Sequence, residues 1–210
     1  MSKDHGGILE DVYTAKSESD LIAAYDVWAA SYDSDLESFG YKVPSIVSGF
    51  FGRHVSPTDT PILDAGAGTG MISEGLTYLG YHGITAIDLS EGMLAVARKK
   101  SIYDQAIKMR LGDRLDFGDE HFAATVCAGT LTTGHVKADA FDELVRVTRP
   151  QGHVIFSVRV DSDRGSAYLA RQNELEAENK WILKDKTQPL ISMPLAEPEV
   201  LHQVFVYQVA

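Results

Sequence analysis

The chain has 210 residues, 44% apolar and 23% charged, which suits one globular α/β domain and is short for two. The formal net charge of −11 opposes binding to nucleic acid and to anionic lipid, and no apolar run approaches the ~20 residues of a membrane span. Because the start of the chain lacks a signal-peptide pattern and the single cysteine cannot form an internal disulfide, we expect a cytosolic or nuclear protein, with a cytoplasmic location as the default.

The first 55 residues predict a helical extension. After a polar start, apolar and aromatic residues recur at three- and four-residue steps, including Tyr25, Trp28 and Tyr32. Such a stripe fits plain core packing, but the phenols carry polar tips that packing alone does not require. Packing and a lid over a ligand therefore both stay open as roles for these tyrosines. A second helix is expected over residues 44–54.

The stretch Ile62-Leu63-Asp64-Ala65-Gly66-Ala67-Gly68-Thr69-Gly70 predicts a buried strand, a glycine-rich loop and a helix that starts near Met71. Glycine permits positive φ and lets a ligand approach the main chain, while a helix start offers unpaired amide donors. The spacing differs from the Gly-x-Gly-x-x-Gly pattern that seats a pyrophosphate. Asp64 at the strand end would repel a pyrophosphate and attract an α-ammonium group. The alternative is a tight strand-helix turn that binds no ligand.

The next expected strand, residues 83–87, places Asp88 at its end. A right-handed crossover sets the two strands side by side, so Asp64 and Asp88 face one crevice. A carboxylate there can accept hydrogen bonds from both hydroxyls of a ribose. It could instead cap the following helix, but Ser90 is available for that task.

Two further strands are expected at residues 106–111 and 122–128. The first is followed by Gly112-Asp113, a pair that also reads as an ordinary turn signal. Cys127 in the second fits a small buried hydrophobe better than a nucleophile. The loop 129–135 lies where open α/β sheets hold their reacting ligand, and His135 is its titratable side chain.

The rest of the chain predicts a helix near residues 141–148, a turn at Arg149-Pro150-Gln151-Gly152 and a strand at 154–158. A polar helix over about 162–179 follows, and residues 181–194 suggest one strand with an interruption. The alternating residues 204–209 are typical of an antiparallel edge or hairpin strand.

Four segments in order resemble the class I, Rossmann-like S-adenosylmethionine-dependent methyltransferases of the broad type 11/12 group: Asp64 to Gly70, Asp88 to Leu94, Gly112 to Leu115 and Leu144 to Ser157. The aromatic stripe and the Thr132 to His135 loop resemble, more narrowly, the Williams-Beuren syndrome region methyltransferase-like branch. The resemblance implies a three-layer α/β fold whose mostly parallel, seven-stranded sheet has one antiparallel strand. It also implies an N-terminal helical lid (1–55) on a cofactor-binding domain (56–210).

The resemblance implies S-adenosyl-L-methionine as cofactor, S-adenosyl-L-homocysteine as product, and no metal ion. In it, Met93 lies against the adenine face and Asp113 reaches the adenine amino group. His135 and Tyr32 become candidate catalytic residues. The predicted cofactor-binding residues are Tyr25, Trp28, Tyr32, Asp64, Ala65, Gly66, Gly68, Gly70, Asp88, Leu89, Met93, Gly112, Asp113, Arg114, Leu115, Ala128 and Gly129.

The implied reaction is an in-line displacement at the sulfonium methyl, in which the cofactor supplies the leaving group and a protein base is optional. We expect a small acceptor, neutral or cationic and partly aromatic, with no nucleic-acid or membrane partner; the oligomeric state stays open. One alternative is a non-catalytic cofactor-binding scaffold. Another is a nicotinamide-dependent oxidoreductase, although Gly-x-Gly-x-x-Gly and Tyr-x-x-x-Lys are both missing from the sequence.

Overall fold

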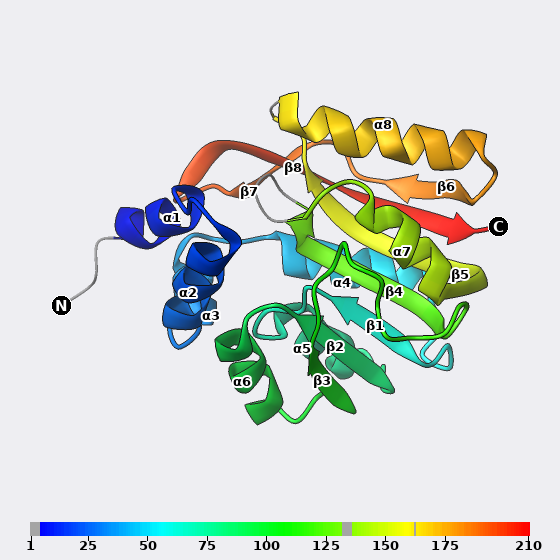
Figure 1. Cartoon of the computed structure of the whole chain (residues 1–210), viewed down its shortest axis with the longest axis horizontal. Helices are drawn as coiled ribbons and strands as arrows, with labels where there is room; N and C mark the ends of the chain where they lie inside the picture. Colours follow the sequence, from blue (N-terminus) through cyan, green and yellow to red (C-terminus); the bar gives the residue numbers. More distant parts are fainter. Residues whose placement is uncertain (1–4, 132–135, 162) are drawn as a thin grey trace.

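The computed structural model describes residues 5–131, 136–161 and 163–210. In this part of the chain, four helices precede an alternating series of strands and helices (Figure 1). The helices are α1 (His5–Tyr13), α2 (Glu18–Trp28), α3 (Tyr32–Ser38), α4 (Val43–His54), α5 (Met71–Tyr78), α6 (Glu91–Lys99), α7 (Ala140–Val147) and α8 (Asp163–Ala177). The strands are β1 (Ile62–Ala65), β2 (Ile84–Asp88), β3 (Gln105–Lys108), β4 (Phe122–Leu131), β5 (Thr148–Arg159), β6 (Trp181–Lys186), β7 (Leu190–Met193) and β8 (Glu197–Val209).

The strands form one sheet in the order β3-β2-β1-β4-β5-β8-β6, with β7 also paired to β8. Strands β1 to β5 pair in parallel, and β8 runs antiparallel to β5. On its other edge β8 pairs first with β7 and then with β6, both antiparallel. The predicted mostly parallel sheet with one reversed strand is confirmed. The interrupted strand expected at 181–194 is β6 followed by β7, which brings the sheet to eight strands.

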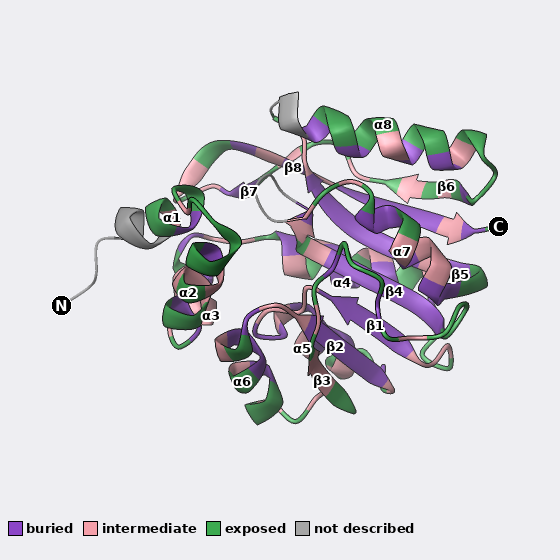
Figure 2. Cartoon of the chain, viewed as in Figure 1, coloured by how far each residue is buried: buried purple, intermediate pink, exposed green. Residues whose placement is uncertain are grey.

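Alternate residues of the central strands face opposite layers of helices, because successive side chains of a strand point to opposite sides. On β8, Val204 and Val206 belong to a buried cluster that includes residues of α4 and α5. Phe205 and Tyr207 belong to a second cluster that includes residues of α7 and α8. Figure 2 shows the resulting buried centre of the sheet. Each fully buried large apolar side chain contributes roughly 1.5–3 kcal/mol, so packing on both faces stabilises the sheet that carries these loops.

The first three helices form a separate buried cluster beside the sheet, which includes Trp28 of α2 and Met193 of β7. Two backbone hydrogen bonds join this region to the C-terminal part of the chain. Lys42 N donates to Ser192 O at 2.9 Å, and Leu195 N donates to Phe39 O at 3.2 Å. The helical extension is therefore attached to the end of the chain as well as to its neighbours in sequence.

Some expected boundaries differ from the structure. The aromatic stripe does not form one helix through Tyr32: α2 ends at Trp28 and α3 begins at Tyr32. At this break Asp35 accepts hydrogen bonds from Trp28 Nε1 and Ser31 Oγ, both at 2.8 Å. The polar first segment contains α1. Within the described ranges, every helix is too short or too polar to traverse a lipid bilayer.

The strand ends also differ. β3 stops at Lys108, short of the expected residue 111. β4 continues to Leu131, through residues that were expected to form a loop. Its pairing with β5 is irregular between Cys127 and Leu131, and Gly129 N donates there to Ser157 Oγ at 3.0 Å. β5 begins at Thr148, and the expected turn is a bulge inside it. Gly152 is required there, since a Cβ would lie 2.6 Å from a backbone oxygen of β4.

Candidate active site

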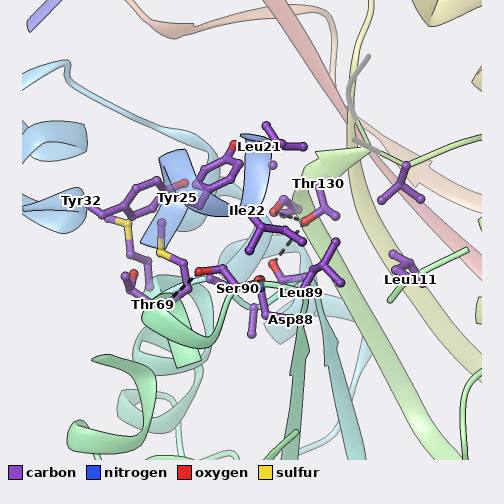
Figure 3. A pocket seen from close by; sticks show the side chains of 18 of the residues that line it. Leu21, Ile22, Tyr25, Tyr32, Thr69, Asp88, Leu89, Ser90, Leu111 and Thr130 are labelled. Carbon is purple, nitrogen blue, oxygen red and sulfur yellow. Dashed lines mark hydrogen bonds between the residues drawn. The ribbon is translucent and has the colours of Figure 1, made fainter. Parts of the chain in front are cut away.

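A pocket opens at the carboxyl ends of β1, β2 and β4, beneath α2 and α3. Its walls come from the glycine loop after β1, the turn after β2, the end of β4 and the N-terminal helices. Figure 3 shows Leu21, Ile22 and Tyr25 on one side of this space and Asp88 and Leu89 on the other. Open α/β sheets hold their ligands at this edge.

The structure brings part of the predicted site together in this pocket. The predicted residues that line it are Tyr25, Tyr32, Gly66, Gly68, Asp88, Leu89, Met93, Ala128 and Gly129. The predicted residues that are not among its lining are Trp28, Asp64, Ala65, Gly70, Gly112, Asp113, Arg114 and Leu115. His135 lies outside the described residues.

The glycine loop has the left-handed backbone that its composition predicts. Gly66, Gly68 and Gly70 have φ of +76°, +55° and +88°. Gly66 N and the next amide both donate to Ile87 O, at 2.8 and 3.0 Å, so the loop is fixed to β2. A Cβ on Gly66 would collide with Thr130, whereas a Cβ on Gly68 would meet nothing within 4 Å. Gly68 is therefore the loop residue that leaves open space for a ligand.

Asp88 stands at the end of β2 and faces the pocket. Its carboxylate accepts hydrogen bonds from Gly68 N and from Ser90 N, each at 2.8 Å. Burial raises the pKa of Asp88, while these amide donors act in the opposite direction. A carboxylate offers roughly four acceptor positions, so two hydroxyls of a ligand can still bind. Ser90 caps α6, as expected: its Oγ accepts from Met93 N at 3.1 Å.

Asp64, at the end of β1, is buried and does not line the pocket. Ser73 Oγ and Tyr103 Oη both donate to its Oδ2, at 2.6 and 2.7 Å. Burial raises the pKa of Asp64 from 3.8 to about 6, and the two hydroxyl donors limit that rise. Neither hydrogen bond uses Oδ1 of Asp64.

Three tyrosines form the polar tips of an otherwise apolar cover. Tyr25, Tyr32 and Tyr41 all line the pocket. Burial raises the pKa of each phenol above its ordinary value of 10. Each phenol therefore stays protonated near neutral pH and can act as a hydrogen-bond donor. Trp28 packs against the ring of Tyr32, with centroids 4.7 Å apart, and so supports the cover without facing the pocket.

Several pocket residues are missing from the predicted set. Ser90 and Thr130 each adjoin a predicted residue, so widening each motif by one position would have found them. The turn after β3 contributes Leu111, which precedes the predicted Gly112 to Leu115 segment. Tyr41 lies between α3 and α4, and no pattern in the sequence places it at the pocket. Across the described ranges, no group of three or more His, Cys, Asp or Glu is placed to hold a metal ion.

Comparisons with known proteins agree with this geometry. Residues 63–156 match the family model described as a methyltransferase domain. The chain is 36% identical over 150 residues to a demethylmenaquinone methyltransferase from Clavibacter sepedonicus, covering 67% of this chain and 58% of that protein. It is 35% identical over 142 residues to a malonyl-[acyl-carrier protein] O-methyltransferase from Yersinia pestis, covering 65% of this chain and 49% of that protein. The chain thus spans about half the length of these curated relatives.

Solved structures share the fold. An S-adenosylmethionine dependent methyltransferase from Mesorhizobium loti superposes with a TM-score of 0.60 at 15% identity, covering 76% of this chain and 96% of that one. The family match does not support the nicotinamide-dependent alternative. The narrower resemblance to the Williams-Beuren branch has no support among these relatives and stays a prediction. Residues 63–156 are thus similar to a methyltransferase domain, and the chain has the fold of S-adenosylmethionine-dependent methyltransferases.

Proposed function

We propose that this chain transfers a methyl group from S-adenosylmethionine to a small-molecule acceptor. The observation that carries the proposal is the pairing of Gly68 with Asp88 at the mouth of the pocket. An open left-handed glycine and a carboxylate of the neighbouring strand are joined by a 2.8 Å hydrogen bond. Such an arrangement suits a ligand that presents a diol to the carboxylate and its chain to the main-chain amides.

The residues of the pocket fit the cofactor. Asp88 would hold the ribose, and Leu89, Met93 and Leu111 give apolar walls for an adenine ring. The bound cofactor supplies an activated methyl group on a sulfonium. The protein contributes alignment, exclusion of water and hydrogen-bond donors, and alignment alone can be worth roughly 7–11 kcal/mol in the best model reactions. Asp113 is exposed and paired with an arginine at 3.0 Å, so its predicted adenine contact stays a prediction.

The acceptor is proposed to be neutral or cationic and partly aromatic. The charged residues on the described pocket walls are Glu18, Asp88 and Arg110. Arg110 is already paired with Glu18 at 2.6 Å and with Asp113. An anionic acceptor would therefore lack a free counter-charge on these walls, while the phenols can donate to a carbonyl or hydroxyl. This favours the kind of acceptor in the name of the demethylmenaquinone relative over a malonyl group, which carries a negative charge.

We also propose that the lid consists of α1 to α3 and that the cofactor-binding domain contains the rest. The predicted division at residues 55 and 56 puts α4 with the lid. However, α4 contributes Val43, Val47 and Phe51 to the buried cluster under the sheet. The covering role is thus assigned to the helices whose own cluster lies beside the sheet.

Calorimetry with S-adenosylmethionine and S-adenosylhomocysteine tests the proposal. Both should bind, and Asp88→Ala should weaken binding at least tenfold, since hydrogen bonds to a charged group contribute ~1.5–3 kcal/mol each. Gly68→Val should fill the open space beside the glycine loop and so block the cofactor. Gly118→Val is the matched control, because Gly118 also faces open space. If neither ligand gives a heat of binding, the proposed function is wrong. Binding without methylation of any compound in a metabolite mixture would favour the scaffold alternative.

His135 is proposed as an acceptor-proton base, on the basis of its position in the sequence alone. His135→Ala should leave cofactor affinity unchanged. A rate loss of no more than a few-fold would remove it from the reaction. Tyr32→Phe tests the other candidate, and the expected effect is on acceptor KM, since its protonated phenol can donate to an acceptor oxygen.

A further inference from the structure

The lid contains the dipeptide Tyr-Asp twice, as Tyr25-Asp26 and Tyr32-Asp33. Both tyrosines line the pocket. The aspartates have no part in the function proposed so far. Each of them, however, bonds to one of the two segments that would hold the cofactor.

Asp26 accepts hydrogen bonds from the turn after β2. Its Oδ1 accepts from Ser90 Oγ at 2.5 Å and from Gly92 N at 2.8 Å. Ser90 N in turn donates to Asp88 Oδ1 at 2.8 Å. Ser90 therefore links the lid carboxylate of Asp26 to Asp88, the residue proposed to hold the ribose. The side chain of Ser90 is buried, with 2% of its surface exposed.

Asp33 bonds to the glycine loop. The hydroxyl of Thr69, a buried loop residue, donates to Asp33 Oδ1. Lys100 Nζ lies 2.7 Å from Asp33 Oδ2 and 2.8 Å from Glu74 Oε2. The lysine side chain is 17% exposed, so this pair is less screened by solvent than an ordinary surface ion pair. Asp33 thus joins the lid to the loop directly and, through Lys100 at the end of α6, to Glu74 of α5.

A glycine at the contact shows independently that the approach is close. A Cβ on Gly92 would lie 2.8 Å from Asp26 Cα and 3.0 Å from Asp26 O. Only a residue without a side chain allows α2 to come this near to the start of α6. The contact is therefore built by both partners, and a methyl group should force them apart.

We propose that Asp26 and Asp33 are positioning residues that fasten the lid to the two cofactor-binding turns, so that Asp88 and Gly68 are held in binding geometry while the tyrosines cover the pocket. The proposal rests on the proposed function, in that the ligand so held is S-adenosylmethionine. In each Tyr-Asp pair, the tyrosine faces the ligand and the aspartate secures the helix that carries it.

Hydrogen exchange of the unliganded protein tests the fastening without any cofactor. Asp26→Ala and Gly92→Ala should each raise amide exchange over residues 18–38 by about tenfold, as expected for loss of hydrogen bonds to a charged group. Glu37→Ala, which changes an exposed acid on α3, is the matched control and should exchange like the wild type. Wild-type exchange in both test variants would overturn the proposal.

Stopped-flow binding of S-adenosylmethionine tests the positioning role. The dissociation rate should rise about tenfold in Asp26→Ala and Asp33→Ala, with little change in global unfolding. Asp26→Asn keeps an oxygen acceptor and should restore slow dissociation. Faster exchange with unchanged dissociation would overturn the positioning role. If exchange rises but the wild-type chain binds neither ligand, the fastening is supported and the methyltransferase proposal fails.

Discussion

The sequence predicts that Asp64 binds the α-ammonium of the cofactor, and on that prediction cofactor binding should depend on pH. Burial raises its pKa from 3.8 to about 6. The ionised fraction of this group therefore rises from about one tenth at pH 5 to about nine tenths at pH 7. The α-ammonium of the cofactor stays protonated over this range and would favour the ionised carboxylate.

The magnitude follows from these fractions. If the ammonium binds only the ionised form, the affinity for S-adenosylmethionine should rise about tenfold between pH 5 and pH 7, or ~1.4 kcal/mol. Asp64→Asn should bind more weakly than the wild type at pH 7 and show no such rise. The stability of the unliganded protein should change in the opposite direction to the affinity. Because the pKa of Asp64 is higher in the folded state, the free energy of unfolding should decrease as the pH rises from about 4 to about 6.

Calorimetry at pH 5, 6, 7 and 8 measures the affinity directly. The same titrations in buffers of different ionisation enthalpy should show release of a proton near pH 6 for the wild type and not for Asp64→Asn. An affinity that is equal at pH 5 and pH 7 would refute the assignment of Asp64 to the ammonium. So would an identical pH slope in the wild type and Asp64→Asn, which would point to another titrating group.

Three further changes have defined outcomes. In Gly66→Ala the added methyl group would collide with Thr130 of β4 at a φ of +76°, so the free energy of unfolding measured in urea should fall by roughly 2–5 kcal/mol. Gly118→Ala, in open space, should stay near the wild type. Tyr103→Phe removes a donor from the buried carboxylate, so the midpoint of the pH-dependent affinity should move to higher pH; an unchanged midpoint would contradict this. Arg146→Met leaves Glu143, whose side chain is 13% exposed, without its partner and should lower the free energy of unfolding by about 3 kcal/mol in chemical denaturation.

The sequence predicts best those features whose causes lie close together along the chain. The glycine loop, the acid at the end of β2 and the Ser90 cap each follow from a few adjacent residues, and the structure has all three. Alternation of apolar residues likewise predicts β8, because its two faces meet different layers. The mostly parallel order of the sheet follows from these local units and from the handedness of their connections.

Features that depend on distant partners are not predictable in this way. Asp26 meets Ser90 across 64 positions, and Tyr103 meets Asp64 across 39, so no local pattern marks either contact. Small residues at Gly129 and Thr130 suggest a loop, but they lie in β4, where the residues on either side of them pair with β5 and Gly129 N donates to Ser157 Oγ. Tertiary contacts, rather than propensity, decide such positions.

The attachment of the lid to β7 can form only after a large part of the chain has been synthesised. The backbone partners of Phe39 and Lys42 are Leu195 and Ser192, which lie far along the chain from them. During synthesis the first helices therefore emerge from the ribosome long before the strand that completes their surroundings. A chain made only as far as β5 would have the loops of the pocket and the contacts of Asp26 and Asp33, but it would lack the backbone partners that β7 and Leu195 supply to the lid.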